Sequence, residues 1–373
     1  MQKQLIDALA RAGERPLRAV IGLDGFVDEI VHVVDKRYSP IRFDRLRTLK
    51  EYGERIAAAA GLSTNMEFIT VARKQGGNGP IMALGLKRFG AEVTYIGAVG
   101  GQTVDAVFAE LAQGSRMIGV CEPGHTDAME FEDGKLICCK LDTLNRMTWE
   151  NIRERLPESE FAALLDETRL ISFNNWTMLP SMSDIWLRLL QDVLPLMRAP
   201  KEGKTLFFDL ADPQKRDAAD LEEALLLIRR FKAAGFRTAL GLNKKEACEI
   251  AAVAGCSFSS IAEADLQELT RQIARLMNID CVVVHPTDSA ACVLDGQYTA
   301  VQGPYCAKPK LTTGAGDNFN AGFAYGLVMG FDAALCLTLG TAASGFYVRE
   351  GRSPTLAEMR DFLEKWSRGA LDS

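Results

Sequence analysis

Residues 311–322 read Leu-Thr-Thr-Gly-Ala-Gly-Asp-Asn-Phe-Asn-Ala-Gly, a glycine-rich turn followed by a helical pattern. The glycines lack a Cβ, so the backbone can turn tightly there and approach a ligand closely. Phe319, Phe323 and Leu327 then recur every four positions, which predicts a helix with an apolar stripe. Because the free N–H groups and the dipole of a helix start attract anions, we expect a phosphate site at this turn.

A carboxylate stands at the start of the same predicted helix. Asp317 would lie at the mouth of the anion site, where it could take a proton from a substrate hydroxyl. The alternative is an ordinary helix cap, since Asp is a favoured N-cap residue. Gly322, Gly326 and Gly330 form a second stripe, which predicts a neighbouring helix packed close against this one.

The longer pattern Thr-Thr-Gly-Ala-Gly-Asp-x-Phe-x-x-Gly resembles the C-terminal signature of the ribokinase-like (PfkB) carbohydrate kinases. The resemblance implies that Gly314, Ala315 and Gly316 form an anion hole for the transferred phosphoryl group. It also implies that Asp317 is the general base.

Composition limits the class of protein. The chain has 373 residues, 47% of them hydrophobic, which is enough for a large buried core. The net charge is −6, and no long basic run or membrane-spanning apolar run is present, so we expect neither nucleic acid nor a membrane as partner. Nine cysteines without a Cys-x-x-Cys pair, and an N-terminus that reads as an amphipathic helix instead of a signal peptide, predict a cytoplasmic protein.

Strand-like apolar runs alternate with helical patterns along most of the chain. This alternation predicts an α/β fold with a doubly wound, mostly parallel sheet flanked by helices. The predicted strands are Val93–Ala98, Leu170–Phe173, Thr205–Leu210, Thr238–Leu242 and Cys281–Val284. The predicted helices include Pro80–Phe89, Asp184–Met197, Leu221–Ala234, Lys244–Val253 and Ala262–Met277.

Two regions lack the alternating helices. Segments of about 22–40 and 120–145 read as strand, turn and strand, and Asp133-Gly134 is a hairpin signal. They predict a small antiparallel β lid like that of the ribokinase-like fold. Since no linker marks a domain boundary, we expect one domain over residues 1–373.

A second glycine-rich turn precedes the predicted helix at Pro80. Gly76, Gly77 and Asn78 could bring backbone amides and a side-chain amide to a polyhydroxy ligand, although a plain turn is an equal alternative. The segment resembles the N-terminal signature of the family and implies a sugar site there. Ile81 stands where the family often has an Asn, and Asn78 could replace that contact.

An aspartate near the end of the first strand completes the predicted acceptor site. In the family such an Asp accepts hydrogen bonds from vicinal hydroxyls, and Asp28 fits this position best. The spacing is one residue longer than expected, so Asp24 remains an alternative. The longer spacing also resembles the ADP-dependent sugar kinases. Asn175, after the strand Leu170–Phe173, is a further candidate for the sugar.

The remaining motifs concern the donor. Asn243-Lys-Lys-Glu246 resembles the Asn-x-x-Glu motif that orders Mg²⁺ near the donor phosphates, with a reciprocal helix cap as the alternative. By resemblance Asn243, Thr287 and Thr313 would bind the nucleotide. Asp209-Leu-Ala-Asp-Pro-Gln-Lys-Arg resembles a family segment at a strand end.

Two departures concern donor binding. Leu311 replaces an Asp of the family signature, and His285–Ala290 replaces a glycine-containing loop. With these departures, the sequence predicts a kinase that transfers the γ-phosphoryl group of ATP to a sugar hydroxyl with Mg²⁺. A monovalent cation is a further possible cofactor, and the lid sheet could pair with that of a second subunit to form a homodimer. The alternatives are a nucleoside kinase, an ADP-dependent sugar kinase and a non-catalytic sensor of sugar or nucleotide.

Overall fold

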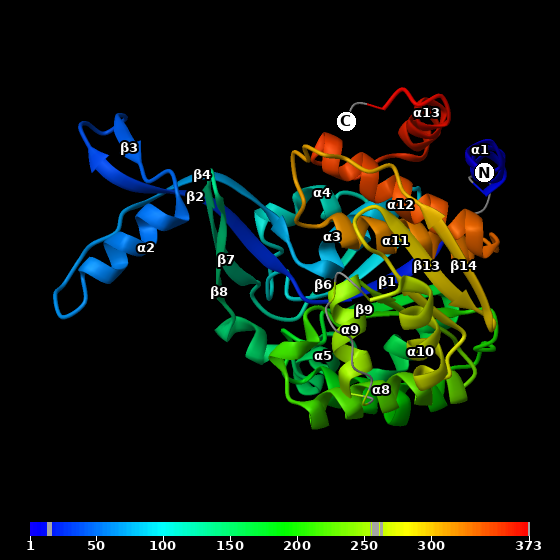
Figure 1. Cartoon of the computed structure of the whole chain (residues 1–373). Helices are drawn as coiled ribbons and strands as arrows, with labels where there is room; N and C mark the ends of the chain where they lie inside the picture. The colour runs from blue at the N-terminus through cyan, green and yellow to red at the C-terminus, as the bar shows by residue number, and fades with distance from the viewer. Residues whose placement is uncertain (13–16, 254, 256–260, 262–263, 372–373) are drawn as a thin grey trace.

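A nine-stranded sheet forms the centre of the molecule (Figure 1). The computed structural model describes the chain except residues 13–16, 254, 256–260, 262–263 and 372–373. The strand order is β14-β13-β12-β11-β10-β9-β1-β5-β6, and neighbouring strands from β12 to β6 are parallel. The strands are β1 Arg18–Leu23, β5 Glu92–Gly97, β6 Arg116–Gly119, β9 Leu170–Asn174, β10 Thr205–Asp209, β11 Arg237–Leu242, β12 Cys281–Val284, β13 Ser289–Leu294 and β14 Gln297–Gln302. The mostly parallel sheet that the sequence predicted is confirmed.

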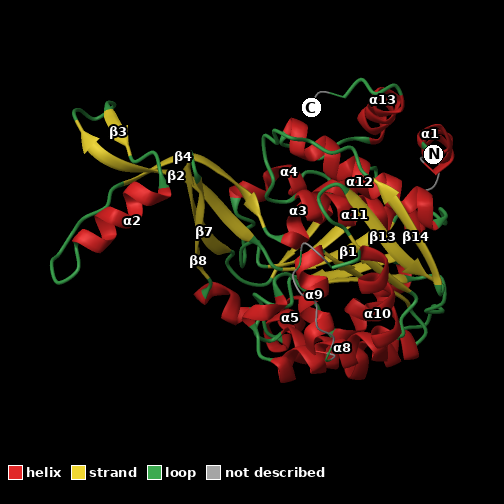
Figure 2. Ribbon diagram, in the orientation of Figure 1, coloured by secondary structure: helices red, strands yellow, loops and turns green. Residues whose placement is uncertain are grey.

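Helices cover both faces of this sheet, as Figure 2 shows. One layer contains α1 Gln2–Ala12, α3 Asn78–Arg88, α4 Ala109–Ala112, α11 Ala315–Val328, α12 Ala333–Glu350 and α13 Leu356–Ser367. The other contains α5 Trp149–Arg155, α6 Glu158–Glu167, α7 Met182–Arg188, α8 Ala218–Ala233, α9 Lys244–Val253 and α10 Leu266–Met277. Strand side chains alternate between the two cores, with Phe207 in one and Phe208 in the other. Burial on both faces explains why the strands read as continuous apolar runs.

The predicted helices exist, with differences at their ends. The helix predicted over Asp184–Met197 is α7, continued by a π turn at Leu189–Val193 and a 3₁₀ turn at Leu194–Leu196, where Pro195 cannot donate a helical hydrogen bond. The helix predicted from Ala262 begins at Leu266, because the Asp265 side chain caps its first turn; residues 262–263 lie outside the described part. Further 3₁₀ turns are Ala106–Phe108, Asp142–Arg146 and Pro213–Lys215.

A second, five-stranded sheet extends from one edge of the body as the lid. Its strands are β2 Phe26–Arg37, β3 Phe43–Arg45, β4 Phe68–Gly76, β7 Gly124–Phe131 and β8 Gly134–Lys140. The hairpin at Asp133-Gly134 is confirmed, since β7 and β8 pair antiparallel around it. The predicted lid segments omitted β4 and β3, which complete the sheet.

The prediction that the lid is antiparallel is wrong at its centre, where β2 and β7 pair in parallel. The two strands directly continue β1 and β6, and these belong to the parallel part of the main sheet. Strands β2 and β7 therefore leave the body in the same direction. The lid is a mixed sheet for this reason.

An arm projects beyond the lid (Figure 1). It contains β3 and the helix α2 Leu49–Ala58. A capping box formed by Thr48 and Glu51 stabilises the first turn of α2. A small separate core holds the arm on the lid, made of Val31, Val33, Leu46, Tyr52 and Met129. The sequence analysis did not predict this arm.

The glycine stripe of α11 packs against α12. A Cβ on Gly322 would lie 2.8 Å from the carbonyl oxygen of Leu339, and one on Gly326 would lie 3.2 Å from the Cys336 sulfur. The close helix contact predicted at these two glycines is confirmed. At Gly330 it is wrong, because this residue follows the helix with a φ of 78° and a Cβ there would meet no atom within 4 Å.

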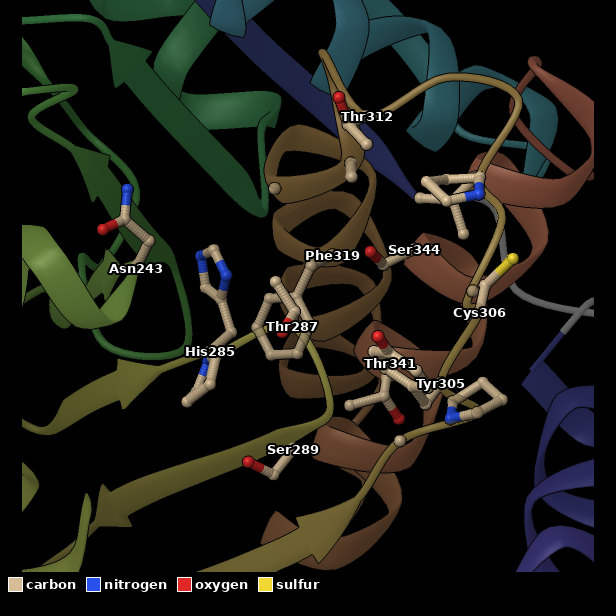
Figure 3. A pocket seen from close by; sticks show the side chains of 18 of the residues that line it. Asn243, His285, Thr287, Ser289, Tyr305, Cys306, Thr312, Phe319, Thr341 and Ser344 are labelled. Carbon is tan, nitrogen blue, oxygen red and sulfur yellow. The ribbon is translucent and has the colours of Figure 1, made fainter. Parts of the chain in front are cut away.

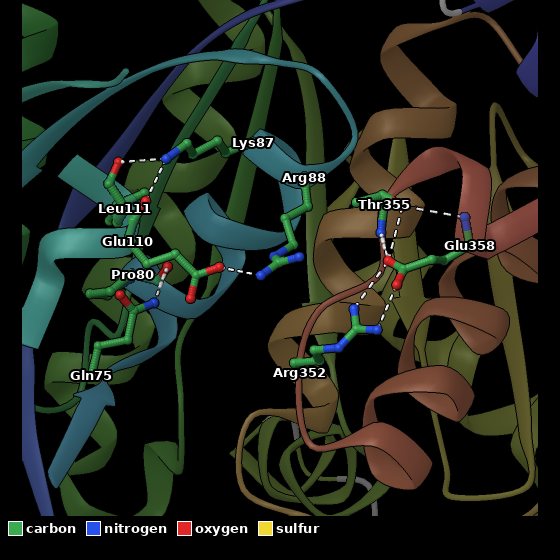
Figure 4. Close-up of polar contacts among 9 residues, drawn as sticks. All are labelled: Gln75, Pro80, Lys87, Arg88, Glu110, Leu111, Arg352, Thr355 and Glu358. Carbon is green, nitrogen blue, oxygen red and sulfur yellow. Dashed lines mark hydrogen bonds and ion pairs between the residues drawn. The ribbon is translucent and has the colours of Figure 1, made fainter. Parts of the chain in front are cut away.

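Polar contacts fix the helices that carry the site (Figure 4). At the end of α3, Arg88 pairs with Glu110 of α4, and Lys87 donates to the carbonyl oxygens of Glu110 and Leu111. At its start, the Gln75 amide donates to the Pro80 carbonyl at 3.2 Å. These contacts hold both ends of α3. None of the described helices combines the length and hydropathy that crossing a bilayer requires.

Candidate active site

Polar residues end five neighbouring parallel strands of the main sheet. Carboxyl ends of parallel strands share one edge, where ligands of open α/β sheets bind. In sheet order from β12 to β1 these residues are His285, Asn243, Asp209, Asn175 and Asp24. The sequence analysis had assigned them to separate motifs, and the parallel sheet places them along a single edge.

Two cavities flank the turn at residues 312–316. The larger, of about 460 Å³, lies between the loop after β12, the segment 303–309 and α12 (Figure 3). Thr312, Ala315 and Gly316 form part of its wall. The smaller, of about 210 Å³, lies under the lid, and Thr313 lines it. The turn therefore separates a body-side cavity from a lid-side cavity.

The backbone of this turn depends on glycine at its centre. Gly314 has a φ of 92° and is the N-cap of α11. A Cβ there would lie 2.8 Å from the Tyr347 hydroxyl, which donates to the Thr313 carbonyl at 2.9 Å. The Asn318 side chain donates to the Gly314 carbonyl at 2.9 Å. The first N–H groups of α11 are thus presented at a held helix start.

Asp317 lies in the first turn of α11 and keeps 8% of its surface exposed. Burial raises the pKa of this carboxyl well above its usual value, and the charges of Asp209, Asp24 and Glu246 raise it further. A hydrogen bond from Asn78 opposes the rise. A carboxylate with a raised proton affinity beside a helix start is suited to accepting a proton.

Asp24 is fully buried beneath the lid cavity and does not line it. Its carboxylate accepts hydrogen bonds of 2.8 Å from the backbone N–H groups of Asn78 and Gly79 and from the Asn175 side chain. Burial raises its pKa to about 7, which these hydrogen bonds oppose. Asp24 therefore anchors the start of α3 on the end of β1.

Asp28, the preferred candidate for the sugar, lines the lid cavity. Burial raises the pKa of its carboxyl, while the charge of Lys74 and a hydrogen bond from Thr126 oppose the rise. Its carboxylate lies against the Cα of Gly76, where a Cβ would come within 2.4 Å of the carboxylate carbon. Of the two aspartates, only Asp28 reaches the space available to a ligand.

Asn78 connects the two glycine-rich turns. It follows Gly77, whose φ of 100° is unfavourable for other residues, and begins α3. Its side chain hydrogen-bonds both Asp209 and Asp317 and lines the lid cavity. Asn175 lines the same cavity with a φ of 64°. The lid-side cavity thus brings together Asp28, Gly77, Asn78, Asn175 and Thr313 from the predicted set.

Asn243 and Glu246 make the reciprocal helix cap that the sequence allowed. The Asn243 oxygen accepts from the Glu246 N–H at 3.0 Å, and Glu246 accepts from the N–H groups of Asn243 and Asp212 at 2.9 and 3.2 Å. Burial and the nearby Asp209 raise the pKa of Glu246 to about 8. The cap does not exclude a metal role, because an all-oxygen set with crowded negative charge suits Mg²⁺.

The loop after β12 forms one wall of the body-side cavity (Figure 3). His285 stacks on Phe319 of α11, with ring centroids 4.5 Å apart, and burial lowers its pKa to about 4. Thr287 is exposed and lines the same cavity, and Asn243 also lines it. Of the three residues predicted to bind nucleotide, Asn243 and Thr287 therefore line the body-side cavity, and Thr313 lines the lid-side cavity on the other side of the turn.

Several contacts were beyond the sequence analysis. The Asn320 amide donates to Asp209 at 2.7 Å, and the Tyr95 hydroxyl donates to the Asp24 carbonyl at 2.5 Å. Lys74 lines the lid cavity. For Lys74 a signal existed, since it stands in the polar run Arg73-Lys74-Gln75 directly before the glycine-rich turn. For Asn320 and Tyr95 there was none, because each is embedded in an apolar element.

Comparison with known proteins identifies the family. A family model described as prokaryotic ketohexokinase matches residues 9–366. The chain belongs to this family. A ketohexokinase of Haloferax volcanii is 29% identical over 351 residues, which cover 92% of this chain and 90% of the relative. A 5-dehydro-2-deoxygluconokinase of Shouchella clausii is 32% identical over 88 residues, 22% of this chain and 27% of that protein.

Solved structures show the same fold. A ribokinase of Thermotoga maritima superposes with a TM-score of 0.61 at 16% identity, covering 94% of this chain and all of that one. A phosphofructokinase-2 variant of Escherichia coli gives 0.63 at 13% identity, covering 95% and 99%. This member of the prokaryotic ketohexokinase family is therefore an ATP-dependent carbohydrate kinase of ribokinase-like fold, which confirms the resemblance seen in the sequence.

Proposed function

We propose that the enzyme transfers the γ-phosphoryl group of ATP to a hydroxyl of a ketohexose. The observation that carries the proposal is the position of the Gly314 turn between two cavities. ATP would occupy the body-side cavity and the sugar the lid-side cavity, so that the reacting groups meet at the start of α11. The ketohexose follows from the family to which the chain belongs.

In this arrangement Asp317 takes the proton of the sugar hydroxyl as its oxygen attacks the γ-phosphorus. The bond to the β-γ bridging oxygen breaks and ADP leaves. The N–H groups of residues 314–316 stabilise the negative charge on the transferred group. Such electrostatic stabilisation, together with positioning, accounts for most of the catalysis in phosphoryl transfer. Asp28 and Asn175 would orient the sugar through its other hydroxyls.

The crowded carboxylates fit a divalent cation. The charge of Asp209 raises the pKa of the Glu246 carboxyl, and the charges of Asp209 and Glu246 raise the pKa of the Asp317 carboxyl. We propose that Glu246 and Asn243 hold Mg²⁺ through water, near the donor phosphates. The ion would supply positive charge that offsets the phosphate charge. Excess EDTA should abolish turnover and added Mg²⁺ should restore it; full activity in EDTA would contradict the proposal.

The acceptor and donor are tested together by a screen. Nucleotide release is measured over ketohexoses, aldohexoses and nucleosides, with ATP and then with ADP as donor. We expect turnover of a ketohexose with ATP. Preference for adenosine would indicate a nucleoside kinase, and AMP formation an ADP-dependent enzyme. Tight sugar binding by calorimetry without transfer to any acceptor would indicate a sensor.

We also propose that two copies pair through their lids. The lid exposes large apolar side chains in water, among them Phe68, Val71, Leu136 and Ile137. Light scattering of the purified protein tests this, and a monomer at micromolar concentration would contradict it. The cysteines that the structure describes are free thiols, which fits the proposed cytoplasmic location.

A further inference from the structure

Two lysines of the lid strands face the lid cavity. Lys74 lies on β4 directly opposite Asp28 of β2, and Lys135 lies on β8 opposite Glu130 of β7. Both lysines line the cavity together with Asp28. A neutral sugar needs hydrogen-bond partners in its site but has no need of two cations.

The two lysines differ in their pairing. Lys135 is bound to Glu130 at 3.0 Å. Lys74 is half-buried and, among the described residues, makes no hydrogen bond or ion pair, although the charges of Asp28 and Glu130 favour its protonated form. Burial of an unpaired ammonium is unfavourable, and desolvation lowers the pKa of Lys74 accordingly. An anionic group of a ligand would relieve this cost.

The cavity has a direction, set by the lid strands. The inner end of the cavity is next to the N-terminus of α11 and is lined by Phe26, Asn78 and Thr313. Along β2 the lining passes through Asp28 to Ile30, and residues two apart on one face of a strand are separated by roughly 6–7 Å. A ligand with its reacting hydroxyl at Thr313 would therefore hold its far end near the lysines. This span matches the length of a six-carbon sugar.

We propose that the acceptor carries an anionic group, a carboxylate or a phosphate, at the end opposite the phosphorylated hydroxyl, and that Lys74 and Lys135 bind it. The inference rests on the proposed transfer to a ketohexose and specifies that this keto sugar carries the anionic group. Asp28, which lies opposite Lys74, would accept hydrogen bonds from the hydroxyls next to the anionic group. Lys74 would form the main charge contact, because Lys135 already has a carboxylate partner.

Initial rates with three acceptors test the proposal: D-fructose, the keto sugar acid 5-ketogluconate, and fructose 6-phosphate. The wild type, Lys74→Met, Lys135→Met and the control Lys50→Met are compared, since Lys50 is exposed on α2 away from the cavity. We expect at least one anionic acceptor to exceed fructose in kcat/KM. Lys74→Met should lower kcat/KM for that acceptor by about 10- to 100-fold, mainly through KM, and should lower kcat/KM for fructose by a clearly smaller factor. Lys135→Met should have a smaller effect.

Whichever anionic acceptor responds to Lys74→Met identifies the group as carboxylate or phosphate. Fructose turned over as well as both anions, with Lys74→Met affecting all three equally, would overturn the inference and leave the kinase proposal intact. Calorimetry without nucleotide measures sugar binding independently of phosphoryl transfer, so it shows whether the kinase proposal alone fails. Lys74-dependent binding of an anionic sugar without phosphoryl transfer would support the ligand class and contradict the kinase proposal. If the protein neither binds an anionic sugar nor transfers a phosphoryl group, the inference and the kinase proposal are both overturned.

Discussion

The side-chain amide of Asn320 on α11 donates a hydrogen bond of 2.7 Å to the carboxylate of Asp209 at the end of β10. The two residues are 111 positions apart in the chain. The bond ties the helix that carries Asp317 to the sheet edge, one turn beyond the proposed base. The distance between the base and the other carboxylates is therefore set by a buried contact.

Replacing the proposed base tests its role directly. Asp317→Asn keeps the size of the side chain and removes its proton affinity, so kcat should fall by roughly 10²-fold or more. Nucleotide affinity, measured by calorimetry, should stay within about 3-fold of the wild type. Asp7→Asn, on an exposed position of α1, is the control. Near-normal turnover of the Asp317 variant would remove the base assignment.

The contact between Gly76 and Asp28 predicts a sugar-specific defect. A Cβ in Gly76→Ala would come within 2.4 Å of the Asp28 carboxylate carbon and displace it. We expect the KM for the sugar to rise by about 10-fold or more, because charged hydrogen bonds to its hydroxyls are lost, with the KM for ATP unchanged.

The matched control is Gly53→Ala in α2, where a Cβ meets no atom within 4 Å. It should leave both KM values unchanged and slightly stabilise the helix. An unaltered sugar KM in Gly76→Ala would show that Asp28 does not grip the acceptor.

The buried carboxyl groups predict how stability depends on pH. Burial raises the pKa values of Asp209, Asp24 and Glu246 to about 6, 7 and 8. The folded protein then binds more protons than the unfolded chain at any pH between about 4 and these values, so the free energy of unfolding decreases as pH rises through this range. We expect the ligand-free protein to be less stable at about pH 8 than at about pH 5.5, by urea denaturation.

Mg²⁺ should reduce this pH dependence, because a bound cation stabilises the ionised carboxylates. The same denaturation series with and without Mg²⁺ measures the difference. Stability that increases from about pH 5.5 to 8 would contradict the raised pKa values, and an equal slope with Mg²⁺ would contradict a metal site among them.

The close packing of α11 on α12 predicts a loss of stability on enlarging Gly322. In Gly322→Ala the added carbon would lie 2.8 Å from the Leu339 carbonyl oxygen and 3.1 Å from Ala343 Cβ. Separating the helices should lower the free energy of unfolding by about 1–3 kcal/mol. Since Thr341 and Ser344 of α12 line the body-side cavity, the KM for ATP should also rise. Gly53→Ala is again the control, and an unchanged urea midpoint would contradict the tight contact.

Sequence periodicity predicted the positions of helices and strands better than it predicted which strands pair. The strands around Thr205 and Thr238 were clear because parallel strands are buried on both faces and read as apolar runs. The parallel pairing of β2 with β7 was not predictable, because 86 residues with other elements lie between Arg37 and Gly124. Short strands such as β3 have too few residues to show a period.

The sequence by itself determined the chemistry of the turn: Gly314 and Gly316 allow the backbone to expose its N–H groups, and Asp317 follows at the helix start. These are local properties, because backbone conformation depends on residues next to one another. Only the tertiary structure decided between Asp24, buried as an anchor, and Asp28, facing a cavity, and only it placed Lys74 unpaired beside Asp28. Burial and charge proximity depend on how distant strands and helices pack, and a linear pattern does not contain that information.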